Sequence, residues 1–238
     1  MINKVSLEPA FVLHTRPYQE TSILVDFFTR SYGRLNAIAK GAKKPKSPLR
    51  SVLTPASKLS VSLSGKSELK TLSSVEIIDH FPINNGVSFN SIVYVNELII
   101  KATEKEDPHL VIFDNYEILL KKLSYQSDQV YLEENLRNFE LNLLQEMGYG
   151  IDLSRDAETN KKIEEGFFYR FYPDKGFAIE KGNLNSEKSF SGLDIINFKK
   201  GNFEKKETRD SSKIIMRMAL DFHLGNKTLN IRKYLTKN

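Results

Sequence analysis

The sequence of 238 residues contains no cysteine, which excludes disulfide bonds, a thiolate zinc site and a cysteine nucleophile. No apolar run approaches the roughly eighteen residues that a membrane-spanning helix needs, so we expect no such helix. The N-terminal residues MINKVSLEPA lack the apolar core of a signal peptide, which predicts a cytoplasmic protein. The four histidines are too scattered for metal-ligand spacing, and we expect neither a metal nor another cofactor.

Acidic residues are missing between Asp26 and Glu68, although this stretch contains nine basic residues. Because the whole chain has a formal net charge of +5, the rest of it carries a net charge of −4. Lys and Arg hold phosphates through Coulomb attraction and the release of counterions. The charge pattern therefore predicts a polyanion site, with a solvated basic loop as the simpler alternative. The basic residues are Arg30, Arg34, Lys40, Lys43, Lys44, Lys46, Arg50, Lys58 and Lys66.

Catalytic motifs are missing as well. The Gly65-Lys66-Ser67 sequence lacks the earlier glycine that a phosphate-binding P-loop needs, because Ser60 stands in its place. No GxSxG motif of a serine hydrolase occurs. The acidic residues at 26, 68, 76 and 79 do not form the carboxylate cluster of a magnesium-dependent nuclease, and we interpret them as acids on strand faces or strand ends. Nothing in the sequence argues for an enzyme.

Strand patterns dominate the first third of the chain. β-Branched and aromatic residues, or polar and apolar residues in alternation, predict strands at residues 10–14, 21–29, 34–39, 57–64 and 69–80. Arg16-Pro17 is expected to end the first strand, and Ser31-Tyr32-Gly33 to form the turn between the second and the third. Five short antiparallel strands favour the OB barrel, a small fold that binds oligonucleotides, with an SH3-like barrel as the alternative.

The basic stretch is predicted to lie on a hairpin tip and on the loop that follows. Arg30 and Arg34 flank the tip, and the lysines at 40–46 fall where a glycine and two prolines prevent regular structure. We therefore expect a flexible loop. We assign Phe27 and Phe28 to the barrel core, and expect Tyr32, at the hairpin tip, to stack on bases.

Helical periodicity replaces the strand pattern after a linker at residues 82–86. Apolar residues recur at helical spacing at 88–105, 108–124, 131–147 and 208–224, with a last short helix near 231–235. A polar, exposed loop is expected after Gly150, and residues 167–172 and 176–179 predict a small hairpin. The sequence thus predicts an α+β protein with a barrel domain at 1–81 and a mainly helical domain at 82–238, the hairpin being inserted near 150–180.

A second candidate site lies on the predicted helices. Arg137 borders an apolar helix face, and Lys213 and Arg217 lie one turn apart on one side of the last long helix. Cations beside an apolar groove suit a peptide that carries carboxylates and a hydrophobic anchor. An ion pair of Arg137 with Glu133 or Glu140 is the structural alternative, and spacing alone favours it.

Several stretches resemble the bacterial RecO family of DNA repair proteins. AFVLHTRPYQETSILVDFFT and GRLNAIAKGAKKPKSPLR are similar to the family's opening pattern of R-P-x-x-E-x-S, a G-R turn, and A-K-G-A with a basic tail. YVNELI at 94–99, LRNFELNLLQEMGYG at 136–150 and RMALDFHLGNKTLNIR at 217–232 follow in the family's order. The opening pattern falls on Arg16, Pro17, Glu20, Ser22, Gly33, Arg34 and residues 39–42.

This resemblance implies an N-terminal OB barrel, a helical middle and a C-terminal region that holds zinc in many members. The four zinc cysteines are absent here, as in a cysteine-free branch of the family, so the loop and hairpin near 150–180 must hold without metal. The family binds single- and double-stranded DNA and anneals complementary strands. With RecR, and in many bacteria RecF, it helps to load RecA onto DNA coated by single-stranded DNA-binding protein. The resemblance implies a bacterial, nucleoid-associated recombination mediator that is not an enzyme.

Two sets of site residues follow. We assign DNA contacts to the basic stretch, where lysines on a loop offer no fixed geometry for reading base edges, so binding should depend steeply on salt and little on sequence. The resemblance also implies that the helical domain binds the acidic, phenylalanine-ended tail of single-stranded DNA-binding protein. The DNA set is Arg30, Tyr32, Arg34, Lys40, Lys43, Lys44, Lys46 and Arg50; the tail set is Leu136, Arg137, Phe139, Leu143, Lys213 and Arg217.

Three other functions are compatible with a basic OB barrel. An RNA-binding module would bind structured RNA at least as tightly as single-stranded DNA. A nuclease would consume the oligonucleotide in the presence of magnesium. An adaptor without annealing activity would use the basic loop to grip an acidic protein.

Overall fold

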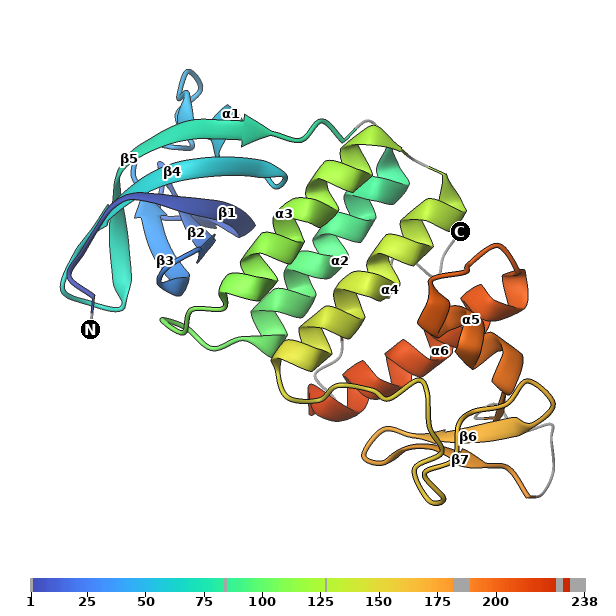
Figure 1. Ribbon diagram of the computed structural model, residues 1–238. Helices are drawn as coiled ribbons and strands as arrows, with labels where there is room; N and C mark the ends of the chain where they lie inside the picture. Colours follow the sequence, from blue (N-terminus) through green and yellow to red (C-terminus); the bar gives the residue numbers. More distant parts are fainter. Residues whose placement is uncertain (1, 84, 127, 182–188, 226–228, 232–238) are drawn as a thin grey trace. The chain divides into compact units, whose positions relative to one another are not determined.

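The computed structural model describes residues 2–83, 85–126, 128–181, 189–225 and 229–231 (Figure 1). The contacts within the chain divide it into two compact units. The first unit contains the described residues up to 125 together with 229–231, and the second contains those from 126 to 225. No helix in the described ranges has the length and apolar character needed to cross a membrane.

Five strands of the first unit form a closed barrel in the order β1-β2-β3-β5-β4. All neighbouring strands are antiparallel except β3 and β5, which pair in parallel. This order and this parallel pairing are those of the OB fold, so the predicted OB barrel is confirmed over the SH3-like alternative. The strands are β1 (Lys4–Tyr18), β2 (Ser22–Thr29), β3 (Gly33–Ala39), β4 (Ser57–Ser64) and β5 (Leu69–His80).

Strand β1 is much longer than predicted and does not end at Arg16-Pro17. Pro17 lies opposite Ile23 in the ladder with β2, whereas the ladder with β4 extends only as far as Phe11. A proline has no N–H to give to a second neighbour, but an edge position does not require one. The end of β1 is such an edge in the described structure, and this is why the proline did not stop the strand.

The barrel interior contains the residues that the alternating pattern pointed inward. Val25 and Phe27 of β2 and Val61 of β4 are fully buried in one apolar cluster. Phe28 is also fully buried, but on the outside of the barrel, where its ring lies 5.5 Å from that of Phe113. The assignment of Phe27 and Phe28 to buried positions is therefore confirmed.

Two helices of the first unit, α2 (Gly86–Ala102) and α3 (Leu110–Tyr125), pack on the barrel. Asn96 of α2 is buried and donates to the carbonyl of Leu13 at 2.9 Å, next to the register shift in β1, while its Oδ1 accepts from the Tyr116 hydroxyl at 2.5 Å. The amide thus satisfies a carbonyl beside a bulge and ties both helices to β1. The contacts place α2 and α3 in the same compact unit as the barrel. The predicted domain boundary at 81–82 therefore stays a prediction.

The chain returns to the first unit near its C-terminus. Leu229 is buried, and the carboxylate of Glu97 accepts the backbone N–H groups of Asn230 at 2.8 Å and Ile231 at 3.0 Å. Two stretches of the family resemblance, at 94–99 and at 217–232, therefore meet through Glu97 and residues 230–231. The short helix predicted at 231–235 lies outside the described residues, apart from Ile231 itself.

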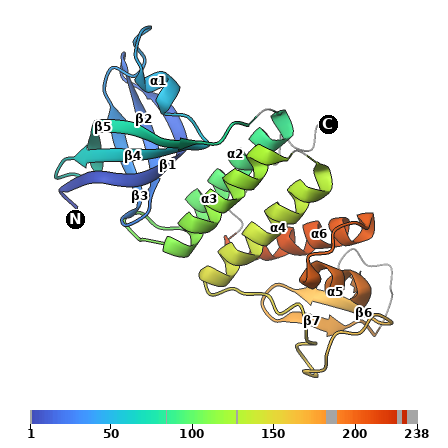
Figure 2. The same ribbon diagram turned by 45° about the horizontal axis from the view of Figure 1, so that its top comes forward.

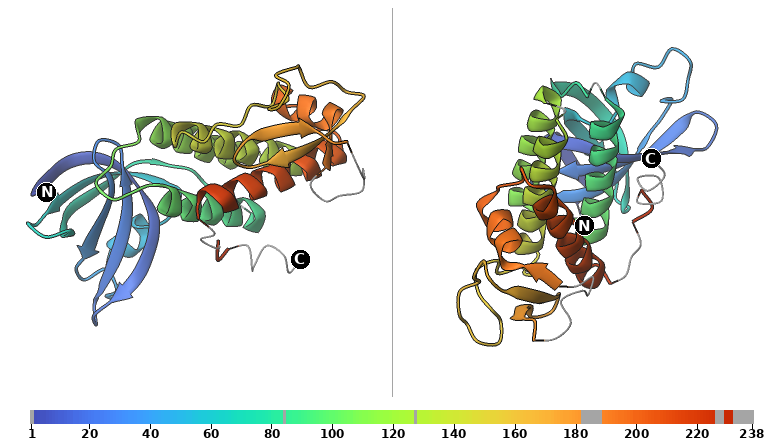
Figure 3. Two further views of the ribbon diagram at one scale, coloured as in Figure 1. Left: turned by 90° about the horizontal axis from the view of Figure 1, so that it is seen from below. Right: turned by 90° about the vertical axis from the view of Figure 1, so that its right-hand side faces the viewer.

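The second unit combines helices with a small sheet (Figure 3). The strand order of this sheet is β7-β6-β8. The predicted hairpin is present as β6 and β7, but β8 and α5 were not predicted. Helix α5 begins after Ser191, whose hydroxyl accepts from the N–H of Leu193, and ends at Gly201 in the left-handed conformation. The elements are α4 (Gln129–Glu146), β6 (Phe168–Tyr172), β7 (Gly176–Ile179), β8 (Ser189–Ser191), α5 (Gly192–Lys200) and α6 (Lys206–His223).

The sequence predicted a polar, exposed loop after Gly150, but part of this segment is buried. Asp156 is 2% exposed, and its carboxylate accepts from the N–H groups of Glu158, Thr159 and Ile179 and from the Thr159 hydroxyl. Burial acts to raise the pKa of Asp156, but these hydrogen bonds outweigh it and hold the pKa below its usual value. The chain has no cysteine, so this region does not fit a thiolate zinc site. The buried carboxylate of Asp156 fastens the segment to β7 instead.

Candidate nucleic-acid interface

We name residues 40–50, which run from the end of β3 into α1 (Leu49–Val52), the basic loop. It is anchored to the tip of the β1–β2 hairpin at its beginning. Ala42 is 2% exposed, the N–H of Lys43 donates to the carbonyl of Thr21 at 2.9 Å, and the Lys43 ammonium donates to the carbonyl of Gln19 at 3.1 Å. The loop is therefore fastened where it leaves the barrel, rather than free along its whole length.

The rest of the basic loop is a series of tight turns that ends in a short helix. The N–H of Lys44 donates to the carbonyl of Gly41, and the N–H of Ser47 donates to that of Lys44. Pro48 then begins α1, whose residues Leu49 and Val52 pack against the barrel core. The sequence predicted the irregular turns but not α1, which places Arg50 on a helix.

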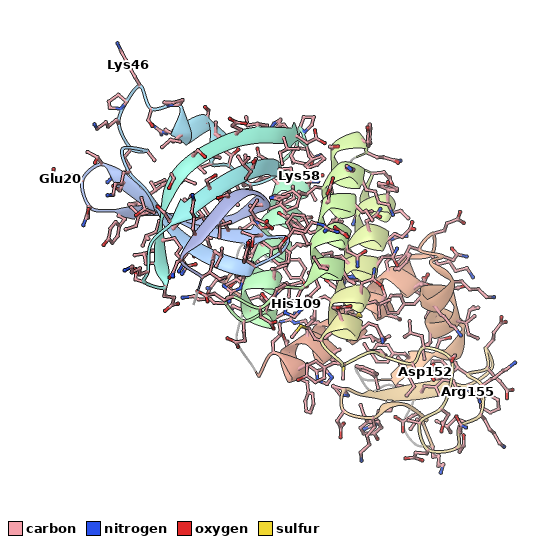
Figure 4. All side chains as sticks on the ribbon, turned by 60° about the vertical axis from the view of Figure 1, so that its left-hand side comes forward. Glu20, Lys46, Lys58, His109, Asp152 and Arg155 are labelled. Carbon is pink, nitrogen blue, oxygen red and sulfur yellow. The ribbon has the colours of Figure 1, made fainter. Side chains whose placement is uncertain are left out.

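The cationic side chains of the basic loop point into solvent. Lys40, Lys44, Lys46 and Arg50 are all exposed, and within the described ranges no acid lies within ion-pair distance of them. Lys46 projects from the end of the barrel beside the hairpin tip that carries Glu20 (Figure 4). Unpaired cations are the ones that can exchange small counterions for phosphates.

Arg30, at the other end of β2, is in a different situation. Its guanidinium forms a two-pronged pair with Asp114 of α3, from Nε to Oδ1 at 3.2 Å and from Nη2 to Oδ2 at 3.1 Å. Hydrogen bonding to this carboxylate raises the pKa of Arg30 above its usual value. The pair is partly exposed, but its charge is already neutralised within the molecule.

Lys58 is paired in the same way with an acid of α3. Its ammonium lies 2.7 Å from Oε2 of Glu117, whose other oxygen accepts from Lys121 at 2.8 Å. Burial acts to raise the pKa of Glu117, but the hydrogen bonds from the two lysines outweigh it and lower the pKa. Lys58 therefore fastens β4 to α3.

Arg34 is buried, with 8% of its surface exposed, although the sequence placed it in the DNA site. Its guanidinium donates to the carbonyl of Thr103 at 2.7 Å and to the Thr103 hydroxyl at 3.0 Å, and burial lowers its pKa. Gly33 beside it has a φ of +65°, and a Cβ there would lie 2.1 Å from the carbonyl oxygen of Asp107. The G-R turn of the family pattern thus packs the hairpin tip against the end of α2.

Tyr32 is partly buried and packs against the barrel core, and its stacking on bases stays a prediction. The hairpin tip at 30–34 and the basic loop lie at opposite ends of the β2–β3 pair, in which Thr29 faces Gly33 and Ile23 faces Ala39. Six residues of strand separate these ends, roughly 20 Å. Figure 2 shows the basic loop projecting above β2 and α1, away from α2 and α3. The residues predicted as one site therefore fall into two groups.

The residues predicted for the tail site are mostly buried in α4. Arg137 pairs with Glu140 at 2.7 Å, with side-chain exposures of 10% and 0%, as the structural alternative proposed. The Nε of Arg137 is buried and has no hydrogen-bond partner among the described residues. Leu136, Phe139 and Leu143 are buried, whereas Lys213 and Arg217 of α6 are exposed, Arg217 lying 3.8 Å from Asp221.

The structure also brings together residues that the sequence did not assign to a site. Asp26 and Asn36 face each other on β2 and β3, and Lys105, which follows α2, contacts Glu68. The sequence carried a weak signal for this group, because strand alternation places Asp26 and Asn36 outside the barrel. Among the described residues no three acids or histidines come together as metal ligands.

Models of one protein family match both parts of the chain. The model described as Recombination protein O N terminal matches residues 3–81, and that described as Recombination protein O C terminal matches residues 87–232. The chain belongs to the RecO family. DNA repair protein RecO of Polynucleobacter asymbioticus is 40% identical over 234 residues, which cover 98% of this chain and 96% of the relative. The RecO proteins of Haemophilus influenzae and Coxiella burnetii are 39% and 37% identical, over 98% and 99% of this chain and 96% and 100% of their own lengths.

Membership of the RecO family gives the chain a general role in DNA repair. The structure shows what several residues of the RecO-like pattern do. Gly33 and Arg34 pack the hairpin tip, and Asn96 and Glu97 fasten α2 to β1 and to the C-terminal residues. Ala42 anchors the basic loop. These residues of the pattern have structural roles in the first unit.

Proposed function

We propose that this protein is a recombination mediator that binds single- and double-stranded DNA through the basic loop and anneals complementary strands without catalysing covalent chemistry. The observation that carries the proposal is the group of exposed, unpaired cations Lys40, Lys44, Lys46 and Arg50. A cationic surface reduces the repulsion between two phosphate backbones, and base pairing then supplies the free energy. Membership of a DNA repair family supports DNA as the polyanion.

The shape of the basic loop favours contacts to phosphates over contacts to base edges. Its lysines lie on successive turns, and each ends in a compact ammonium on a flexible stem. Such ammonium groups can neutralise phosphates at any position along a strand, and contacts to phosphates carry no sequence information. We therefore expect binding that weakens steeply as salt is added, with a slope set by the number of phosphates contacted.

The test is the annealing of two complementary fluorescent oligonucleotides, timed without ATP. The decisive variant changes Lys40, Lys44 and Lys46 to Glu, and leaves Lys43, which fastens the loop to Gln19, unchanged. The matched control changes Lys161, Lys205 and Lys206 to Glu, which alters the net charge equally at exposed positions of the second unit. We expect the native protein and the control to accelerate annealing, and the loop variant to lose most of the acceleration.

Equal loss in both variants would mean that overall charge, not the basic loop, drives annealing. Acceleration by the loop variant as fast as by the native protein would place the DNA site elsewhere. A structured RNA and an oligonucleotide with magnesium, run in parallel, would reveal an RNA-binding module or a nuclease. No acceleration by any of the three proteins would leave the role of an adaptor.

We also propose that α4 and α6 bind the acidic, phenylalanine-ended tail of single-stranded DNA-binding protein. Lys213 and Arg217 offer exposed cations for the carboxylates of the tail. Arg137 is paired with Glu140, and its side chain is 10% exposed. Removing Arg137 alone would leave the buried Glu140 without this ion-pair partner and so reduce stability. The cleaner variant therefore changes Lys213 and Arg217 to Glu.

Fluorescence anisotropy with a labelled tail peptide tests this site. We expect the Lys213→Glu, Arg217→Glu variant to bind at least about ten-fold more weakly, because opposite charges replace two cations that face an acidic ligand. Unchanged affinity would remove α6 from the site. The double change Arg137→Gln, Glu140→Gln then tests Arg137 without leaving a lone buried charge.

The loading of RecA with RecR, with an indirect role for RecF, completes the proposed function and rests on family membership. RecA ATPase activity on DNA coated by single-stranded DNA-binding protein measures it. We expect RecR and this protein together to shorten the lag before RecA ATPase activity begins. With the loop variant in place of the native protein, the lag should stay long. A lag unaffected by the native protein would remove this part of the proposal.

A further inference from the structure

A hollow of about 180 Å³ lies on the outside of the barrel, at the middle of β2 and β3. Leu24 and Asp26 of β2 and Asn36 of β3 line it, with Arg16 of β1, Leu69 of β5 and the flanking residues Glu68 and Lys105. Its volume equals that of about six water molecules in the liquid, well below the size of a typical drug site. It therefore suits one small group.

The charges around this hollow cancel, in contrast to those of the basic loop. Arg16 and Lys105 contribute two positive charges, and Asp26 and Glu68 contribute two negative ones. The Lys105 ammonium contacts the Glu68 carboxylate, so part of this charge is already paired. A phosphate would gain little here, because an acid accompanies each cation. The hollow suits an uncharged ligand with both donors and acceptors.

Hydrogen bonds connect three of the polar side chains that line the hollow, Lys105, Asn36 and Asp26. With its amide oriented to satisfy both neighbours, Asn36 donates to Oδ1 of Asp26 and accepts from Nζ of Lys105 at 3.2 Å. Oδ2 of Asp26 lies 3.9 Å from Nδ1 of His14, which is too long for a hydrogen bond. Asp26 lines the hollow, and His14 leaves the lone pairs of this carboxylate oxygen unused. The hydrogen bond from Asn36 to Oδ1 holds the carboxylate in place.

We propose that this hollow is a nucleobase subsite that prefers guanine, next to the backbone contacts of the basic loop. Leu24 and Leu69 provide apolar contact for the ring. Guanine presents two adjacent N–H donors to one carboxylate, and its O6 accepts from a cation such as Arg16 or Lys105. Adenine and cytosine present one exocyclic amine, and thymine places carbonyl oxygens where the carboxylate of Asp26 would repel them.

The location of the hollow fits a strand that the basic loop holds. Asn36 and Lys40 are four residues apart along β3 and its extension, or roughly 13 Å. The surface of strands 2 and 3 and the loops beside it form the side on which OB folds bind oligonucleotides. The subsite rests on the proposed function, since it reads a strand that the loop retains. It adds a modest base preference to binding that is otherwise blind to sequence.

The test measures the affinity of the full chain for a short labelled oligothymidylate and for the same strand with one central guanine, adenine, cytosine or hypoxanthine. We expect the guanine strand to bind at least about five-fold more tightly than the all-thymine strand, as one good hydrogen-bonded base contact predicts. Hypoxanthine lacks the exocyclic amine of guanine and should give an intermediate affinity. Asp26→Asn should reduce the preference to less than about two-fold, because an amide replaces one acceptor by a donor.

Two further variants separate the subsite from general effects. Glu76→Gln removes the same charge from an exposed position of β5 and should keep the guanine preference. Leu24→Phe adds bulk to the hollow without changing its charge, and should remove the preference while leaving the thymine strand bound. Thermal unfolding of each variant confirms that the barrel is intact.

Each outcome decides for or against the subsite. Equal affinity for all five strands overturns it and leaves the proposed function in place, because the strands are still bound. A preference that persists in Asp26→Asn and Leu24→Phe also overturns it. If Asp26→Asn merely strengthens binding to every strand equally, Asp26 acts only through its charge. Failure to bind any strand overturns the proposed function together with the subsite.

Discussion

Cations lie near both ends of the β2–β3 pair, but the two ends use them differently. At the end next to α2 and α3, Arg30 and Lys58 are paired with Asp114 and Glu117, and Arg34 is buried against Thr103. At the other end, the cations of the basic loop are exposed and lack acidic partners among the described residues. A basic stretch in a sequence can thus contain cations that fasten the fold and cations that stay unpaired, and only the second kind is free to bind a polyanion.

The largest expected effect comes from removing the unpaired cations. Changing Lys40, Lys44, Lys46 and Arg50 to Ala should weaken binding to single-stranded DNA about 100-fold near physiological salt, and should lower the slope of log affinity against log salt by about 3. The free energy of unfolding should change by less than about 0.5 kcal/mol, because these side chains are exposed. Anisotropy titrations over a range of salt, with denaturant unfolding, measure both.

A matched control for this variant changes Lys161, Lys162, Lys205 and Lys206 to Ala. These lysines are exposed in the second unit. The four substitutions remove the same charge as those in the basic loop and should leave the slope of log affinity against log salt almost unchanged. An equal reduction of the slope by both variants would break the comparison, because it would show that charge anywhere on the chain serves equally well.

The next effect in size concerns the buried cation of the fastening end. Arg34→Met should reduce the free energy of unfolding by about 3 kcal/mol, since it removes charge-assisted hydrogen bonds and leaves the Thr103 carbonyl without its donor. The DNA affinity of the folded protein should stay within about two-fold of the native value. Urea unfolding measures the loss of stability, and anisotropy on the same sample measures the DNA affinity. A stable variant that bound DNA poorly would return Arg34 to the interface.

A smaller effect should follow pH at the same end. Since the folded pKa of Glu117 is depressed, the pair with Lys58 and Lys121 contributes stability above the unfolded pKa, and this is lost as the pH falls through the folded pKa. Glu117→Gln should remove about 0.5–1 kcal/mol at neutral pH and less in acid. Unfolding at pH 7 and below pH 4 checks this. A loss of equal size at both values would mean that packing, not charge, is responsible.

The smallest effect is expected from exchanging the exposed pair. Arg30→Asp with Asp114→Arg keeps the net charge and the pair but moves the cation to α3. DNA affinity should change by less than about two-fold, because exposed pairs contribute little and this one lies away from the basic loop. The single change Arg30→Asp is the companion variant. A large loss of affinity in the double variant would extend the interface to the hairpin tip.

The sequence predicted the barrel well because strand alternation and turn residues are local signals. The pattern of Ser57–Ser64 identifies β4, since alternate residues face the core and solvent. It predicted the end of β1 wrongly, because tolerance of Pro17 depends on which strands lie beside it. It did not predict α5 and β8, which are too short to show a clear period.

The sequence by itself determined where the excess positive charge lies and, through its resemblance to the RecO family, the general role of the protein. Only the tertiary structure decided which cations remain available. Arg30 and Asp114 are 84 residues apart, and Arg34 and Thr103 are 69 residues apart. Composition and periodicity act over a few residues, whereas an ion pair or a buried guanidinium depends on what the folded chain places opposite it. The balanced hollow of Asp26, Asn36 and Lys105 has the same origin, because its hydrogen-bonding groups meet only when β2, β3 and the end of α2 are assembled.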